Sequence, residues 1–204
     1  MGRPRTRIQA RNRETILDAA LEVFSVYGFR GSTVDQIAAK CGLSKPNLLY
    51  YFRRKEDIYK AVLERTLDTW LEPLRALDAQ GDPIAEIAAY VTAKLTLAKQ
   101  KPEASRLFVN EILHGAPAIC DFLTGPLKNL VDEKAAVISG WIAAGKLNPV
   151  DPHHLIFAIW AMTQHYADFD VQVRAVLGKD RGGEGRFEDA ARYLENLFMH
   201  GLVP

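Results

Sequence analysis

The segment 33–52, TVDQIAAKCGLSKPNLLYYF, constrains the fold most strongly, because it specifies two short helices joined by a sharp turn. Thr33 and Gln36 have the spacing of a capping box, in which a hydroxyl accepts from the amide three residues later. Gly42 can adopt the positive φ that a sharp turn requires, and Ser44 can cap the second helix. The pattern predicts a helix-turn-helix.

The remainder of the chain also follows a helical period, and no stretch alternates convincingly as a strand. Asp82-Pro83 and Asp151-Pro152 each place a capping acid before a proline, which is tolerated at the first helical position. We expect an all-α protein of about nine helices. The last two long helices are expected around 152–176 and 187–200, and GKDRGGEG (178–185) is expected to connect them flexibly.

Charge is distributed unevenly along the chain. Residues 1–60 hold 12 Lys/Arg and 6 Asp/Glu, whereas the remainder holds 14 and 19. A basic front suggests a polyanionic partner. There is no run of about 20 apolar residues and no apolar segment typical of a secretory signal. Cys41 and Cys120 are isolated, which fits a reduced compartment. We therefore expect a cytoplasmic protein with no membrane contact.

A helix-turn-helix inserts the N-terminal end of its second helix into the major groove of double-stranded DNA. Lys45 and Asn47 can bond base edges or phosphates, and Pro46 can contact a thymine methyl. One of Tyr50 and Tyr51 should pack, and the other can offer its hydroxyl to a phosphate. The expected DNA-binding residues are Thr33, Ser44, Lys45, Pro46, Asn47, Tyr50, Tyr51, Arg54 and Lys55. Further phosphate or minor-groove contacts are expected from Arg3, Arg5, Arg7, Arg11 and Arg13.

The segment ILDAALEVFSVYGFRGSTVDQIAAKCGLSKPNLLYYFRRKEDIYKAVL resembles the N-terminal domain of TetR-family transcriptional regulators. The resemblance implies a DNA-binding domain in residues 1–52 and an effector-binding and dimerisation domain in residues 53–204. It places Lys45, Pro46, Asn47, Tyr51 and Lys55 at DNA-contacting positions. It also implies a homodimer that forms through the last two long helices. In the second of these, an apolar stripe consists of Phe187, Ala190, Ala191, Leu194, Leu197 and Phe198.

The second part of the chain resembles members of this family that respond to pyrimidines, over segments that include LDTWLEPL, KPEASRLFVNEILHGAP and WAMTQHYADF. Trp160, Gln164 and Asp168 lie at i, i+4 and i+8, close to one helical face. An indole offers a stacking surface, while an amide and a carboxylate can pair with the N–H and C=O groups of a planar imide. Trp70 is expected to form the opposite wall, and Lys94 lies on an apolar face that borders the same cavity. We expect the effector to be uracil, thymine or a related ring.

Other interpretations of these residues stay open. Trp160 can be an ordinary core residue, and Gln164 and Asp168 can bond each other, a neighbouring helix or a partner subunit. A regulator of the same family with a larger apolar pocket would respond to a drug or a lipid. A protein without an effector would be an architectural DNA binder, with strong salt dependence and no sequence preference.

The sequence does not indicate an enzyme or a bound cofactor. Gly140–Lys146 imitates a phosphate-binding loop, but Leu147 stands where a Ser or Thr would hold magnesium, and no strand precedes it. His153 and His154 are adjacent, so on a helix they diverge by about 100° and make a poor metal pair.

Overall fold

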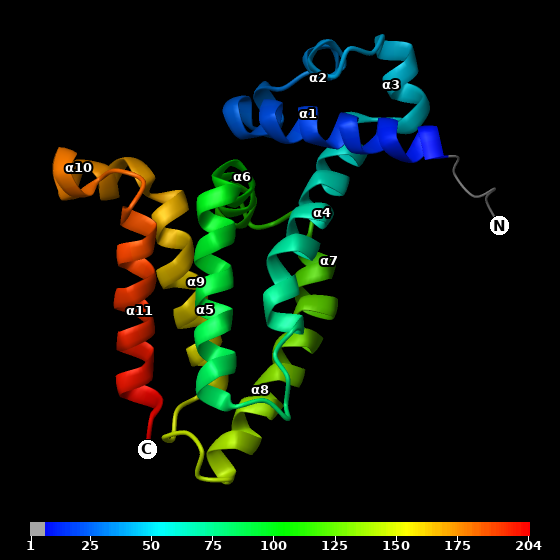
Figure 1. Cartoon of the computed structure of the whole chain (residues 1–204). Helices are drawn as coiled ribbons and strands as arrows, with labels where there is room; N and C mark the ends of the chain where they lie inside the picture. Colours follow the sequence, from blue (N-terminus) through cyan, green and yellow to red (C-terminus); the bar gives the residue numbers. More distant parts are fainter. Residues whose placement is uncertain (1–6) are drawn as a thin grey trace. The chain divides into compact units, whose positions relative to one another are not determined.

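The structure is a computed structural model that describes residues 7–204. It is helical throughout this range and contains no strand there, which confirms the all-α prediction (Figure 1). A π-helical segment, η1 (Leu123–Leu127), connects α7 to α8. No helix within residues 7–204 is long and apolar enough to cross a membrane. The α-helices are α1 (Arg7–Gly31), α2 (Val34–Lys40), α3 (Lys45–Tyr51), α4 (Lys55–Arg75), α5 (Pro83–Gln100), α6 (Pro102–Leu113), α7 (Cys120–Phe122), α8 (Lys128–Ala143), α9 (Pro152–Asp168), α10 (Asp170–Arg181) and α11 (Arg186–Leu202).

The chain forms two compact units. The first holds Met1–Asp68 and Arg106–Cys120, and the second holds Thr69–Ser105 and Asp121–Pro204. Helices α4 and α6 therefore each contribute residues to both units.

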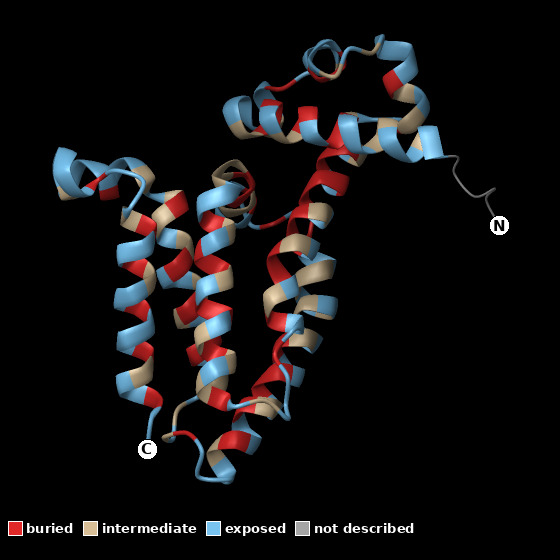
Figure 2. Cartoon of the chain, viewed as in Figure 1, coloured by how far each residue is buried: buried red, intermediate tan, exposed pale blue. Residues whose placement is uncertain are grey.

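The first unit is organised around α1, whose buried face packs with α2, α3 and the start of α4 (Figure 2). The ring of Tyr59 lies 5.0 Å from Phe24 and 4.8 Å from Phe29, measured between centroids. The hydroxyl of Tyr59 donates to the buried carboxylate of Glu111 at 2.9 Å, and the amide of Ala118 donates to the same carboxylate at 2.7 Å. This buried acid is therefore fully engaged, and it attaches the end of α6 to α4 within the unit.

The second unit is built on α5, which packs against both α9 and α11. Helices α5 and α9 run in the same direction and α11 runs back (Figure 1). Asp82 and Asp151 cap α5 and α9 as predicted, each accepting from amides of the first turn next to an N-terminal proline. The unit's main core includes Ile87, Val91, Leu95, Ile138, Ile156, Ile159 and Leu194.

The structure corrects the predicted course of the chain after residue 152. The expected helix over 152–176 is broken at Phe169, whose ψ of 29° ends α9 and precedes α10. The residues on the two sides of the break bind different partners: Asp168 accepts from Ser105 of α6, and Asp170 accepts from Arg186 of α11. The expected connector is also shorter, since α10 continues across Gly178, with φ of 71°, to Arg181. The apolar period does not reveal these breaks because it continues through them.

The apolar stripe of α11 also has a different role from the one predicted. Phe187, Ala190, Leu194 and Phe198 are buried within a single copy of the chain, where α11 packs on α5. Of the stripe, Leu197 stays substantially exposed. Most of the stripe therefore belongs to the core of the unit and is not free to contact a partner.

Candidate DNA-binding surface and effector site

The helix-turn-helix has the local structure that the sequence predicts. Thr33 caps α2, accepting from the amide of Gln36, and the Gln36 side chain accepts from the amide of Thr33. Gly42 has φ of 70° in the turn, and Ser44 caps α3 by accepting from the amide of Asn47. Pro46 lies in the first turn of α3, where no intrahelical N–H is needed.

The N-terminal turn of α3 presents polar and apolar groups to solvent. Lys45, Pro46, Asn47 and Tyr50 are exposed, whereas Leu48 is fully buried and anchors the helix. The ammonium of Lys45 lies 2.8 Å from the carboxylate of Asp35, and both side chains are at least half exposed. An exposed ion pair of this kind is weak, so it can exchange for a phosphate or a base edge.

The two tyrosines of α3 connect this helix to α1. The amide of Asn12 donates to the hydroxyl of Tyr51 at 2.9 Å, and the amide of Gln9 donates to the hydroxyl of Tyr50 at 3.3 Å. Tyr51 is half-buried, while Tyr50 is 72% exposed. The side chains thus fit the expectation that one tyrosine packs and the other faces solvent.

The basic residues that follow α3 are already engaged within the unit. The ammonium of Lys55 donates to the carbonyls of Phe29 and Ser32 at 2.7 and 2.8 Å, and it lies over the ring of Phe29. Two of its three hydrogens are therefore used at the end of α1, and one remains for an anion. Arg54 is exposed and pairs with Asp57 at 3.2 Å.

The predicted basic tail is partly helical. Arg7, Arg11 and Arg13 belong to α1, and the guanidinium of Arg13 lies 4.9 Å from the centroid of the Phe52 ring. Arg3 and Arg5 lie outside the described residues. The sequence does not predict this early start of α1, because its apolar stripe begins only at Ile16.

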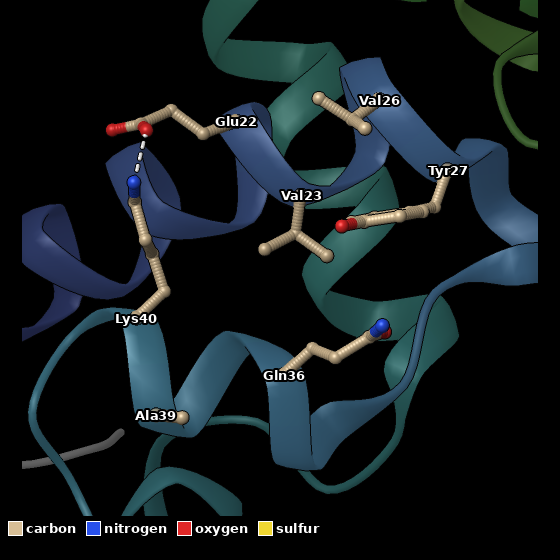
Figure 3. A pocket seen from close by; sticks show the side chains of 7 residues that line it. All are labelled: Glu22, Val23, Val26, Tyr27, Gln36, Ala39 and Lys40. Atoms are coloured by element: carbon tan, nitrogen blue, oxygen red, sulfur yellow. Dashed lines mark ion pairs between the residues drawn. The ribbon is translucent and has the colours of Figure 1, made fainter.

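A pocket of about 420 Å³ lies between α1 and α2 on the first unit (Figure 3). An ion pair of 2.6 Å between Lys40 and Glu22 closes one side of it, and the side chains of Val26 and Tyr27 lie on the other. None of the predicted DNA-binding residues lines this pocket.

The predicted effector residues of α9 face a second row of polar residues on α5. The indole N–H of Trp160 donates to the hydroxyl of Tyr90 at 2.5 Å. Lys94 lies one turn beyond Tyr90, and its pKa responds to the charge of Asp168, two turns beyond Trp160. Gln164 is half-buried and lies on α9 between these two levels. Helices α5 and α9 run in the same direction (Figure 1), so successive turns along α5 follow the same order as successive turns along α9.

Lys94 occupies an unusual environment for a lysine. Its side chain is 3% exposed, and its ammonium lies 4.2 Å from the centroid of the Trp70 ring. Burial lowers the pKa of Lys94 to about 7, and the carboxylate of Asp168 opposes part of this shift. Lys94 therefore loses its proton more readily than an exposed lysine does.

The carboxylate of Asp168 is held by a buried residue of α6. The hydroxyl of Ser105, 1% exposed, donates to one of its oxygens. Sequence reasoning missed both Ser105 and Tyr90. Tyr90 had a signal, because it lies four residues before Lys94 on the same face, but nothing near Ser105 in the sequence indicates its partner.

The two tryptophans are placed differently from each other. Trp70 packs with Ala98, Ala167 and Phe187, and its indole N–H is fully buried without an acceptor within residues 7–204. Trp160 instead packs on the main core of the second unit. The structure thus joins Trp70, Lys94 and Asp168 in one cluster and attaches Trp160 to Tyr90, one turn away along α5.

A capped helix-turn-helix with an exposed recognition helix, joined to a helical body with a buried polar cluster, defines a DNA-binding transcriptional regulator. Residues 16–62 match the family described as bacterial regulatory proteins, tetR family. Residues 63–204 match the YcdC-like protein, C-terminal region, of the same family. The chain therefore belongs to the TetR family, which confirms the resemblance and shows that it is a regulator and not an enzyme.

Similar proteins cover nearly the whole chain. The HTH-type transcriptional regulator RutR of Escherichia coli (strain K12) is 48% identical over 200 residues, which is 98% of this chain and 94% of the relative. AibR, solved in complex with isovaleryl coenzyme A and operator DNA, has a TM-score of 0.69 at 20% identity and covers 91% of this chain and 97% of its own. A TetR-like regulator from Rhodococcus sp. RHA1 has the same TM-score at 22% identity, with 98% of both chains covered. These structures show that the fold is shared.

Proposed function

We propose that this protein is a repressor whose operator binding is released by a small planar pyrimidine such as uracil. The observation that carries the proposal is a buried lysine, Lys94, whose ammonium lies over the indole of Trp70 and senses the charge of the half-buried Asp168. Buried ionisable groups are costly unless they are paired or serve a ligand. A large apolar effector would gain nothing from them, so their presence favours a small polar one.

The chemistry of an imide ring matches these groups. Its N–H can donate to the carboxylate of Asp168, and an adjacent C=O can accept from the ammonium of Lys94. The amide of Gln164 offers a donor and an acceptor side by side, as the ring edge does. The indoles of Trp70 and Trp160 supply flat apolar surface for the two faces of the ring.

DNA recognition is proposed for the exposed turn of α3. Lys45 and Asn47 would bond base edges, and Pro46 would contact a methyl group in the major groove. Phosphate contacts are proposed for Thr33, Ser44, Tyr50, Tyr51, Arg54 and Lys55. AibR supports this general arrangement, because a protein with this fold was solved with operator DNA and a small molecule together.

Homodimer formation is proposed through exposed apolar residues of α9 and α11. From Pro152 to Ala167 the chain contains no Asp, Glu, Lys or Arg, although part of this helix faces solvent. Phe157 and Met162 are 47% and 37% exposed, and Tyr193 and Leu197 of α11 are 61% and 43% exposed. A surface that is apolar, uncharged and exposed in one copy of a chain is typical of a surface that a partner covers. A two-fold pair would require a nearly palindromic operator, and the protein would act in the cytoplasm.

Helix α6 is proposed to carry the signal. Near its start, Ser105 donates to Asp168 of the effector site, and near its end Glu111 accepts from Tyr59 of the helix-turn-helix unit. An effector that binds Asp168 would change the bond to Ser105, and α6, which carries both Ser105 and Glu111, would pass the change to Tyr59. Because such coupling is reciprocal, effector and operator DNA would each lower the affinity for the other.

Titration calorimetry of the purified protein with uracil tests this function. We expect saturable binding at about one site per subunit, with weaker or no binding of cytosine and xanthine. Thymine carries the same imide edge as uracil, so its affinity measures the effect of one added methyl group. Folded, dimeric protein that binds none of these rings would contradict the pyrimidine assignment and leave the DNA-binding assignment intact.

The change Gln164→Ala should lower uracil affinity by about tenfold or more, because it removes a half-buried amide that would pair with the ring edge. Operator affinity without effector should not change. The matched control is Gln172→Ala, which removes an exposed amide of α10. Wild-type uracil affinity in the Gln164 variant would exclude this residue from the site.

A further inference from the structure

Tyr90 is a buried hydroxyl on the wall of the proposed effector site. It lies on α5 one turn before Lys94, and its side chain is 3% exposed. Its oxygen lies 2.5 Å from the indole nitrogen of Trp160. An indole N–H can only donate, so the Tyr90 oxygen is the acceptor in this bond.

The hydrogen of the Tyr90 hydroxyl must therefore point elsewhere. Within residues 7–204 the hydroxyl donates to no acceptor, and a buried donor without a partner destabilises the fold because it has lost its hydrogen bond to water. Burial raises the pKa of Tyr90, so the proton stays on the oxygen at any physiological pH. The hydroxyl is thus a fixed donor that needs an acceptor from outside the protein.

The other free groups on this side of the site are donors too. The ammonium of Lys94 has three N–H groups and no lone pair, and the indole N–H of Trp70 is buried without an acceptor in the described chain. The acceptor, Asp168, lies at the other level, beside Ser105. The donors Tyr90 and Lys94 on α5 would therefore bind an oxygen of the ligand, whereas the carboxylate of Asp168 would bind an N–H of the ligand.

We propose that the Tyr90 hydroxyl donates to a ring carbonyl of the effector and determines its specificity, so that oxo-pyrimidines bind and amino-pyrimidines do not. The proposal rests on the pyrimidine function proposed above and assigns a residue to its selectivity. An amino group in place of the carbonyl would set its N–H groups against the donors of Tyr90 and Lys94. The donors of the protein and the amino group of the ligand would then all lack acceptors. Leaving buried polar groups unpaired is the strongest way for a site to reject an analogue.

The change Tyr90→Phe, which removes one oxygen and keeps the ring, tests the proposal. Calorimetry should show uracil affinity reduced by about tenfold, with the ratio of uracil to cytosine affinity reduced as well. Tyr166→Phe is the matched control, since Tyr166 is a half-buried tyrosine of α9 that packs on Phe187. Thermal unfolding and operator binding of each variant establish that it is folded.

A second measurement does not depend on how the variant folds. Wild-type protein should prefer uracil over cytosine by more than about tenfold, because only uracil offers a carbonyl at both ring positions. Equal affinity for the two rings, or unchanged uracil affinity in Tyr90→Phe, would overturn the role of Tyr90. Failure of the wild type to bind any pyrimidine would instead overturn the proposed function itself.

Discussion

Replacing Lys94 by methionine should make the protein more stable and unresponsive to its effector. Burial holds the pKa of Lys94 at about 7, against an ordinary value of 10.5, so the folded protein carries a penalty for the ammonium below neutral pH. Methionine fills similar space without charge and should raise the free energy of unfolding at pH 6 by about 3 kcal/mol. Uracil should no longer release the variant from DNA, because the donor to the ring carbonyl is gone.

The pH dependence gives this prediction its signature. Between pH 7 and 10.5 the unfolded chain holds the Lys94 proton more tightly than the folded chain does, so wild-type stability rises with pH over this interval. The difference from the methionine variant should therefore be largest below pH 7 and shrink towards pH 10. Urea unfolding at pH 6 and pH 9.5 measures it. The control is Lys101→Met, an exposed lysine that should change stability by less than about 0.5 kcal/mol. A methionine variant less stable than the wild type at pH 6 would contradict the account.

Replacing Phe157 by aspartate should separate the proposed dimer and remove most operator binding. Phe157 is 47% exposed on a part of α9 that contains no Asp, Glu, Lys or Arg. In a two-fold dimer each new carboxylate would be buried against the α9 helix of the second copy. In a dimer, binding of one helix-turn-helix to DNA raises the effective concentration of the second at its half-site. A monomer should therefore lose about a hundredfold or more in operator affinity. Sedimentation velocity measures the oligomeric state, and a gel-shift titration measures DNA binding.

The control for this change is Val26→Asp, which introduces the same charge at a 70% exposed apolar residue of α1. It should leave the oligomeric state unchanged. A Phe157→Asp protein that remains dimeric at micromolar concentration would exclude this face of α9 as the interface.

Local chemistry made the helix-turn-helix predictable from the sequence. Thr33, Gln36 and Ser44 each accept from an amide three residues away, and Gly42 needs only its own positive φ. Such features depend on neighbours in the chain, so their structure follows without knowledge of the tertiary fold. Lys94 was also identifiable, because a lysine on an apolar helical face is unusual whatever packs against it.

The rest of the effector site depends on partners that lie far apart in the chain. Tyr90 meets Trp160 70 positions away, and Ser105 meets Asp168 63 positions away. No spacing rule links such pairs. The stripe of α11 was assigned to the wrong neighbour for a related reason, since periodicity identifies a buried face and does not say what covers it.

The division of the chain also bears on how such regulators can exchange parts. The polypeptide passes between the two units at three places, after Asp68, after Ser105 and after Cys120. A recombination at a single point in α4 would take residues 1–68 from one regulator and the rest of the chain from another. Segment 106–120, which belongs to the first unit, would then come from the second parent. In that chimera Tyr59 would come from one parent, whereas its partner Glu111 on α6 and the Ala118 amide that also binds Glu111 would come from the other. An intact first unit can therefore be transferred only if all three crossing points are exchanged together. The two units of this architecture are thus expected to evolve as coupled pairs.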